Sequence, residues 1–178
     1  PIMAVLSKEI GIEKSLMTTV HSYTASQAIQ DAPKKDPREG RNAAENIVPT
    51  STGAAIAVTK TLPQLEGKFD GISMRVPTPV VSISDITALV NKNVTVEELN
   101  NAFIKASKEP YYQGILGVSD EPLVSRDYIG NSNSGTVDLE LTRVVDGNLI
   151  KVCVWYDNEW GYSNRLVELV ADVAKAIK

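Results

Sequence analysis

The chain has 178 residues, of which 43% are hydrophobic and 22% are charged, an ordinary composition for a globular domain with one buried core. Its 18 basic and 22 acidic residues give a formal net charge of −4, which excludes an overall basic field for binding nucleic acid or an acidic membrane surface. The single cysteine excludes an internal disulfide; together with the lack of a signal peptide or spanning apolar run, this favours a reducing, cytoplasmic compartment. We therefore expect one compact domain over residues 1–178, with small molecules or proteins as partners.

Residues 2–10 predict a helix that ends at Gly11, with Leu6 and Ile10 four residues apart on one face. The chain opens on Pro1, without a methionine, directly into this helix. A natural protein seldom begins inside an element, so we expect the chain to be part of a longer protein.

The β-branched run 18–24 predicts a strand that carries His21, the only histidine of the chain. The pKa of an unperturbed histidine lies near about 6.5, so His21 is the first candidate for proton transfer near neutral pH. A hydrogen-bonded structural role explains the same residue, and this run by itself does not separate the two interpretations.

Residues 26–46 are polar, contain Pro33, Pro37 and Gly40, and have no sustained apolar period. They predict a long irregular loop. Such loops are uncommon inside a compact domain and tend to be functional, so we expect this one to line a site or a subunit contact. A merely solvated loop is the alternative.

Two features suit an anion. Thr52 and Gly53 lead into a helix-forming run at 54–58, and a helix N-terminus offers unpaired N–H groups to a phosphate, although ordinary N-capping by Ser or Thr explains the same residues. Arg75 stands among apolar residues of a predicted strand at 72–76. A half-buried arginine requires an anion, either a protein carboxylate or a ligand phosphate.

The remaining segments predict a strand at 80–90, a helix opened by a capping box at 95–98, an antiparallel hairpin of strands 136–145 and 149–156 around an Asp-Gly turn, and a C-terminal helix at about 163–178. Cys153 lies inside a predicted strand and is interpreted as a core residue. Ser163 is expected to cap the last helix, whose apolar stripe should pack on the core or on a neighbouring domain. One histidine and one distant cysteine predict no metal site.

Four motifs together resemble one known family: residues 17–24 (MTTVHSYT), 49–55 (PTSTGAA), 74–79 (MRVPTP) and 155–163 (WYDNEWGYS). In order and spacing they are similar to phosphorylating glyceraldehyde-3-phosphate dehydrogenase. The resemblance extends over residues 1–178 and corresponds to the catalytic domain and C-terminal helix, about half of the family's full chain. It implies an α+β fold with a mixed, largely antiparallel sheet and helices packed on one face.

In that family a cysteine thiolate attacks the aldehyde, hydride leaves to the nicotinamide, and inorganic phosphate cleaves the thioester. The resemblance implies that His21 pairs with the thiolate, lowers its pKa and acts as the acid–base partner. It further implies that Thr24 and Arg75 hold the substrate phosphate, that Thr52, Gly53 and Arg38, or Arg41 in its place, bind inorganic phosphate, and that Asn158, with Tyr162 nearby, orients the nicotinamide.

Two parts of the family pattern are missing from the chain. The nucleophile belongs to a Ser-Cys-Thr-Thr-Asn motif that precedes the position of Pro1, and neither this motif nor a Gly-x-Gly-x-x-Gly fingerprint occurs here. Cys153 lies far along the chain in a predicted strand and does not replace the nucleophile. We therefore expect the chain by itself to have no dehydrogenase activity.

The function implied by the resemblance is oxidation and phosphorylation of glyceraldehyde 3-phosphate to 1,3-bisphosphoglycerate in glycolysis and gluconeogenesis, by a homotetramer. The resemblance further implies that the loop at 22–44 reaches the cofactor of a neighbouring subunit and that Ala32-Pro33 within it partly decides between NAD and NADP, with NAD as the expected cofactor. One alternative is a related dehydrogenase that acts on erythrose 4-phosphate. Another is a non-catalytic domain that binds anions or mediates assembly.

Overall fold

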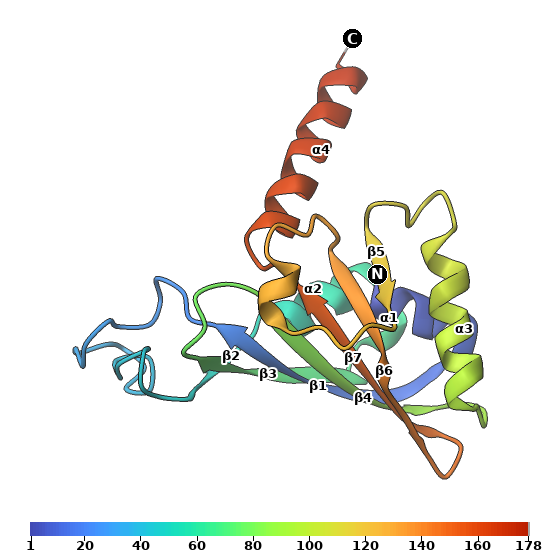
Figure 1. Ribbon diagram of the computed structural model, residues 1–178, viewed down its shortest axis with the longest axis horizontal. Helices are drawn as coiled ribbons and strands as arrows, with labels where there is room; N and C mark the ends of the chain where they lie inside the picture. The colour runs from blue at the N-terminus through green and yellow to red at the C-terminus, as the bar shows by residue number, and fades with distance from the viewer. Residues whose placement is uncertain (178) are drawn as a thin grey trace.

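A computed structural model describes residues 1–177 and contains one mixed seven-stranded sheet (Figure 1). In sheet order the strands are β2 (Val48–Ser51), β3 (Phe69–Val76), β1 (Ile12–Ser22), β4 (Ser82–Val90), β7 (Leu149–Tyr156), β6 (Gly135–Val145) and β5 (Leu116–Ser119). The pairs β1–β3 and β5–β6 are parallel, and the other four pairs are antiparallel. The expected α+β fold with a mixed, largely antiparallel sheet is confirmed.

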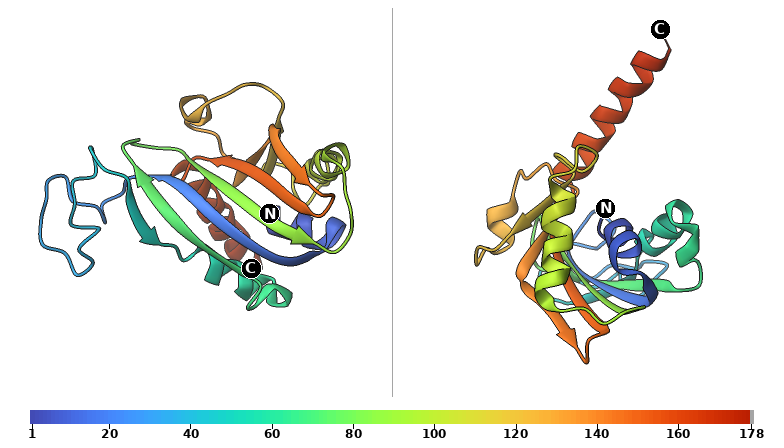
Figure 2. Two further views of the ribbon diagram at one scale, coloured as in Figure 1. Left: turned by 90° about the horizontal axis from the view of Figure 1, so that it is seen from below. Right: turned by 90° about the vertical axis from the view of Figure 1, so that its right-hand side faces the viewer.

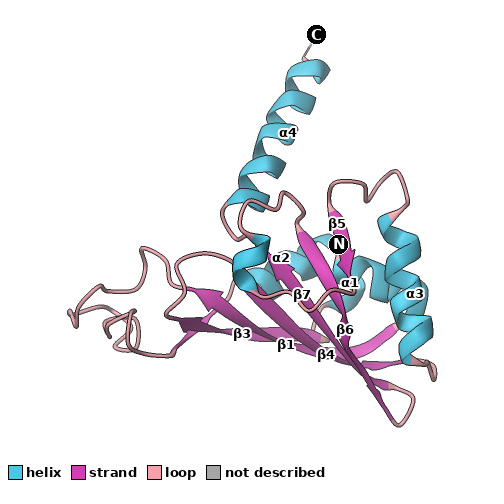
Figure 3. Ribbon diagram, in the orientation of Figure 1, coloured by secondary structure: helices cyan, strands magenta, loops and turns pink. Residues whose placement is uncertain are grey.

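The helices are α1 (Ile2–Val5), which continues as a π-helical turn (Leu6–Ile10), α2 (Ala54–Thr61), α3 (Val96–Ser107) and α4 (Trp160–Ala176), with short 3₁₀ turns at Pro63–Leu65 and Ser125–Tyr128 (Figure 3). The predicted helix at 2–10 ends at Gly11, whose φ of +84° favours glycine. The predicted capping box of α3 is present: Thr95 Oγ1 accepts from the Glu98 N–H at 3.1 Å, and the Glu98 carboxylate accepts from the Thr95 N–H at 2.8 Å.

The hydrophobic core lies between α1, α2, α3 and one face of the sheet, which we call the inner face (Figure 2). Leu6, Leu99 and Phe103 from the helices and Ile86 and Val152 from the strands are buried there. Each such side chain stabilises the fold by about 1.5–3 kcal/mol. The helices therefore hold one face of the sheet rigidly, which fixes the side chains that β1 and β3 direct toward them.

The hairpin predicted around residues 146 and 147 is present, with Asp146 at φ +49° and Gly147 at φ +76° joining β6 to β7. Two residues with positive φ give a turn whose twist matches that of the strands. Cys153 is buried, as predicted, but it alternates with Val152 and Val154 and so lies on the opposite, outer face, in register with Asp85 and Asp138. Burial raises the pKa of the Cys153 thiol.

The C-terminal helix differs from the expectation. It begins at Trp160, because Asp157 Oδ1 accepts from the N–H groups of Glu159 at 3.0 Å and Trp160 at 2.8 Å. Ser163 lies within the first turn and donates to the Glu159 carbonyl at 2.8 Å instead of capping the helix. Its apolar residues Leu166, Leu169, Val170 and Val173 are exposed, and the helix projects from the body of the molecule (Figures 1 and 2). Packing of this stripe on the chain's own core is therefore wrong, and packing on a neighbouring domain stays a prediction.

No helix of the described residues packs on the outer face of the sheet (Figure 2). Leu16, Val20 and Ile72 are large apolar residues exposed on β1 and β3, and they alternate with the core residues Met17 and Phe69. Within residues 1–177, none of the helices has the length and apolar character required to cross a membrane.

Candidate active site

His21 and Arg75 lie side by side at one end of the sheet. They are register partners in the parallel pair β1–β3, and parallel strands present their C-terminal ends at the same edge. Both line a cleft of about 680 Å³ on the inner face, together with Thr52 from the segment before α2 and Tyr156 from the end of β7. Pro1 also lines this cleft, so the start of the chain lies in the wall that faces His21.

Arg75 and a main-chain carbonyl compete for one nitrogen of His21. Arg75 Nη1 lies 2.7 Å from His21 Nδ1 and 3.3 Å from the Ser22 carbonyl oxygen, which itself lies 2.6 Å from His21 Nδ1. A guanidinium only donates, so the contact with Arg75 requires Nδ1 to accept and places the ring proton on Nε2. A hydrogen bond to the Ser22 carbonyl requires the proton on Nδ1. The two contacts therefore require opposite tautomers of His21, so in either neutral tautomer only one of them is a hydrogen bond.

Burial lowers the pKa of His21, the contact with the Ser22 carbonyl opposes this shift, and the positive charge of Arg75 adds to the lowering. Burial also lowers the pKa of Arg75, against the opposing charges of Tyr156 and Glu39. The His21 imidazole is consequently neutral near pH 7 and available to accept a proton. The edge of its ring faces Tyr156, with centroids 6.1 Å apart.

The Arg75 guanidinium has no carboxylate partner within ion-pair distance among residues 1–177. Its Nε donates to Thr50 Oγ1 at 3.4 Å across the β2–β3 ladder. Of the two anions that the sequence left open, the described residues do not supply the protein carboxylate. A cationic side chain that faces a cleft without a paired carboxylate suits a ligand anion.

The segment before α2 contributes to the same cleft. Thr52 Oγ1 accepts from the Ala54 N–H at 3.2 Å, and both residues line the cleft with Arg75. Gly53 is the N-cap residue, and a Cβ added to it would meet nothing within 4 Å. The eight residues of α2 begin here, so the first N–H groups of the helix lie at a cleft that Arg75 also lines. The contact between Thr52 Oγ1 and the Ala54 N–H leaves room for an anion, because it uses only one of the N–H groups at the start of α2.

Thr24 and the two loop arginines do not line this cleft. Thr24 Oγ1 contacts Ser26 Oγ at 3.1 Å. Arg41 Nε donates to Asp31 Oδ2 at 3.1 Å, so its charge is paired within the loop, and Arg38 is exposed. The structure thus brings together His21, Thr52 and Arg75, and leaves the other three candidates on the neighbouring loop.

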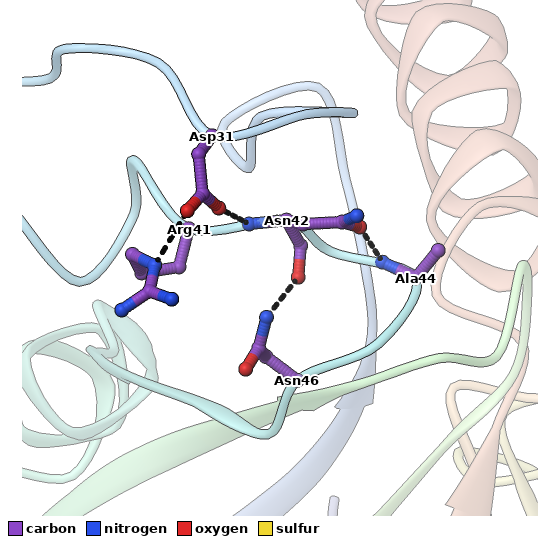
Figure 4. A network of polar contacts seen from close by, with 5 residues as sticks. All are labelled: Asp31, Arg41, Asn42, Ala44 and Asn46. Atoms are coloured by element: carbon purple, nitrogen blue, oxygen red, sulfur yellow. Dashed lines mark hydrogen bonds and ion pairs between the residues drawn. The ribbon is translucent and has the colours of Figure 1, made fainter.

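The predicted loop has no helix or extended strand but is ordered by its own polar contacts (Figure 4). The Asp31 carboxylate accepts from the main chain of Asn42 at 2.8 Å as well as from Arg41. Asn42 in turn accepts from the Ala44 N–H at 2.8 Å and from Asn46 Nδ2 at 2.9 Å. These contacts hold the two arms of the loop together next to the end of β1.

Asn158 lies on the other side of His21, immediately after β7. A hollow of about 300 Å³ is lined by His21, Tyr156, Asn158 and Tyr162, and His21 and Tyr156 also line the larger cleft. The Asn158 Oδ1 atom accepts from Ser22 Oγ at 3.0 Å and from Ser82 Oγ at 3.2 Å. Its amide oxygen is therefore occupied, whereas its NH₂ group has no hydrogen-bond partner among residues 1–177.

The sequence interpretation gave no role to Ser22, Ser82 or Tyr156. In the structure Ser22 and Tyr156 contact His21, and Ser82 bonds to Asn158. No local signal reveals them, because serine and tyrosine at strand ends are common and these three come from different strands. Among residues 1–177, no group of three or more His, Cys, Asp or Glu residues gathers in a way that suits a metal ion.

The chain matches the family described as glyceraldehyde 3-phosphate dehydrogenase, C-terminal domain, over residues 1–158. It is 56% identical over 175 residues to glyceraldehyde-3-phosphate dehydrogenase 1 of Bacillus subtilis strain 168, an alignment that covers 98% of this chain and 52% of the relative. It is 55% identical over 174 residues to the Geobacillus stearothermophilus dehydrogenase (98% and 52%) and 52% identical over 177 residues to that of Mycobacterium avium (99% and 52%). The chain thus spans about half the length of the curated relatives that it matches.

Proposed function

The chain belongs to the glyceraldehyde-3-phosphate dehydrogenase family, and from this premise we propose that it is the catalytic domain of a phosphorylating, NAD-dependent dehydrogenase. The proposed substrate is glyceraldehyde 3-phosphate rather than erythrose 4-phosphate, because the relatives named above all carry the former in their names. The observation that carries the proposal is the cleft that holds His21, Thr52 and Arg75 together.

His21 is proposed as the acid–base residue. Its lowered pKa leaves the imidazole neutral, and it faces a cleft whose wall includes Pro1. A cysteine joined shortly before Pro1 in a longer chain enters the same cleft and gives its proton to the imidazole, which forms the thiolate–imidazolium pair that attacks the aldehyde. The imidazolium gives this proton to the aldehyde oxygen as the C–S bond forms, and the neutral His21 then accepts it back from the resulting hydroxyl as the same carbon loses hydride. The chain by itself, with Cys153 buried on the outer face, is expected to remain inactive.

The anion-binding residues suit two phosphate groups. Arg75, together with Thr24, is proposed to hold the substrate phosphate, since its guanidinium faces the cleft without a paired carboxylate among the described residues. Thr52 and Gly53 at the start of α2, with Arg38, are proposed to bind the attacking inorganic phosphate. Arg41 is the weaker choice, because its charge is paired with Asp31.

NAD supplies the hydride acceptor when it is bound, and Asn158 and Tyr162 are the residues proposed to hold its nicotinamide. The fit is chemical: both hydrogen bonds to Asn158 Oδ1 come from serine hydroxyls, so the amide NH₂ is left to donate to the carboxamide oxygen of the ring. The loop with Ala32 and Pro33 is proposed to approach the cofactor of a neighbouring subunit and to favour NAD over NADP.

The proposed assembly is a homotetramer, in which the outer face of the sheet contacts a second copy. Support comes from the exposed Leu16, Val20 and Ile72 and from a shallow hollow of about 910 Å³ on the same face. An uncovered sheet face with exposed apolar side chains is typical of a surface that becomes buried on association.

The proposal is tested by substituting His21→Asn in the natural full-length protein. We expect thiol alkylation and hydride transfer to slow by about 10²–10⁴-fold, because the neutral amide neither accepts the thiol proton nor stabilises the thiolate. Rapid kinetics of NADH formation and of iodoacetamide labelling measure the two steps. The matched control is Ser107→Ala in α3, whose hydroxyl bonds only to the Ile104 carbonyl, and it should leave both rates unchanged. An unaltered alkylation rate in the His21 variant contradicts the thiolate-pairing role.

A further inference from the structure

Three hydrogen bonds connect Ser22, Ser82 and Asn158. The Ser22 N–H donates to Ser82 Oγ at 3.2 Å, and the two serine hydroxyls both contact Asn158 Oδ1, at 3.0 Å and 3.2 Å. Ser22 is 0% exposed and Ser82 is 2% exposed. The three residues come from the end of β1, the start of β4 and the residue after β7, so tertiary structure alone brings them together.

The direction of each bond follows from the donors available. Ser82 Oγ accepts from a main-chain N–H group, so its own proton is the one directed to Asn158. Ser22 Oγ donates to the same amide oxygen. If the Asn158 amide were flipped, its NH₂ group would face the two hydroxyls, and the two buried hydroxyl protons would lose their acceptor, at a cost comparable to lost hydrogen bonds.

We propose that Ser22 and Ser82 are positioning residues that hold the Asn158 amide with its oxygen inward, so that its NH₂ group faces the hollow next to His21 and binds a carbonyl oxygen of the ligand. This inference rests on the proposed function, in which the ligand group is the nicotinamide carboxamide. It adds two residues to which neither the motifs nor the relatives' names assign a role.

Ser22 contacts His21 as well as Asn158, so it links the two candidate site residues. Its hydroxyl bonds to Asn158, and its carbonyl oxygen lies 2.6 Å from His21 Nδ1. One buried residue therefore fixes both the cofactor-orienting amide and the imidazole of the acid–base residue. A displacement of Ser22 would alter the two groups together, whereas a displacement of Ser82 would alter Asn158 and the Ser22 N–H group that donates to Ser82 Oγ.

The test is a double-mutant cycle in the full-length protein with Ser82→Ala, Asn158→Ala and the double variant. We expect each single substitution to lower kcat/KM for NAD by about tenfold, the effect of one lost hydrogen bond. The loss in the double variant should be smaller than the two single losses combined, because part of the effect of Ser82 passes through the Asn158 amide and is already lost in Asn158→Ala. If Ser82→Ala lowers kcat/KM for NAD by the same factor in the wild type and in Asn158→Ala, the inference is overturned.

A second variant separates positioning from folding. Asn158→Asp keeps an oxygen acceptor for both serine hydroxyls but replaces the NH₂ donor by a second oxygen, so its thermal midpoint should match the wild type while kcat/KM for NAD falls more than about tenfold. Unchanged use of NAD by Asn158→Asp overturns the inference.

The matched control is Ser15→Ala, on the same strand as Ser22 and also buried, but with a hydroxyl that has no partner among the described residues. It should leave kcat/KM unchanged; a tenfold loss there would mean that any buried serine of β1 affects the site, and would overturn the inference. Turnover of glyceraldehyde 3-phosphate by the wild type is measured first. If the wild type shows no turnover, both the proposed function and the inference are contradicted. If the wild type is active but the effects of Ser82→Ala and Asn158→Ala on kcat/KM are independent of each other, the inference alone is contradicted.

Discussion

At the scale of single residues, the state of His21 depends on its burial and on a neighbour 54 positions away. Burial lowers its pKa, and the Arg75 guanidinium, 2.7 Å from Nδ1, lowers it further. A bound phosphate that draws Arg75 away removes the donor from Nδ1 and leaves the nitrogen to the Ser22 carbonyl. In the proposed function, substrate binding and the tautomer of His21 would in this way be connected by one side chain.

This connection predicts the titration of His21, which is readily measured because the chain has no other histidine. In NMR titrations of the 178-residue chain, the pKa of His21 should lie below the value of about 6.5 for an unfolded chain. Because the unfolded state then binds the proton more readily, the free energy of unfolding should fall as the pH drops below about 6.5 and until the folded pKa is passed.

The variant Arg75→Met should raise the pKa of His21 toward that of the unfolded chain, since it removes the positive charge and keeps much of the bulk. Lys60→Met, which changes the same charge on the exposed side of α2, is the control and should not move the titration. A His21 pKa that stays the same in Arg75→Met would mean that burial and the Ser22 carbonyl set it without a contribution from Arg75.

At the scale of secondary-structure elements, α3 and α4 are both amphipathic, yet the structure uses them in opposite ways. The apolar side of α3 is buried against β5 and β6, with Leu99 0% exposed. In α4 only Gly161 is buried, and Arg165 donates to the Gly114 carbonyl at 2.7 Å; beyond this first part, Leu169 is 61% exposed. The same sequence pattern therefore predicts a helix in both places but not what covers it.

Two leucines provide the corresponding test in the 178-residue chain. Leu99→Ala should lower the free energy of unfolding by about 2–5 kcal/mol, because it opens a cavity in the core. Leu169→Ala should change it by less than about 0.5 kcal/mol, because an exposed side chain loses little on truncation. Urea denaturation followed by circular dichroism measures both. A loss above about 1 kcal/mol for Leu169→Ala would mean that α4 packs on the body of this chain.

At the scale of the whole molecule, the helices cover only one face of the sheet. The outer face combines the exposed Leu16 and Ile72 with the Lys151–Asp85 ion pair, whose Nζ and Oδ2 atoms lie 2.6 Å apart. Apolar area of this kind stabilises an assembly by about 25 cal/mol for each Å² that is removed from water. The cleft of His21 lies on the inner face, so association through the outer face leaves it open.

The proposed contact between copies is tested by Ile72→Glu in the full-length protein. A charge placed in the buried contact should convert the tetramer into smaller species, as measured by light scattering after size-exclusion chromatography. Val96→Glu, on a similarly exposed apolar residue at the start of α3, should leave the mass unchanged. A tetramer that persists in Ile72→Glu would exclude this face as the contact.

The sequence by itself determined the elements whose signals are local. The capping box at Thr95 and the turn at Asp146-Gly147 depend on residues a few positions apart, so their physical causes are visible in the printed order. The same holds for the loop after β1, which lacks any apolar period. The four motifs likewise predicted the family, which the comparison confirms.

Only the tertiary structure decided what surrounds each candidate residue. β3 inserts between β2 and β1 and sets Arg75 opposite His21, and the ends of β1, β4 and β7 bring Ser22, Ser82 and Asn158 together. These contacts join residues 54 to 136 positions apart, and no local propensity encodes such pairings. The exposure of α4 was also decided there, because an apolar stripe records that a helix face becomes buried but not which surface buries it.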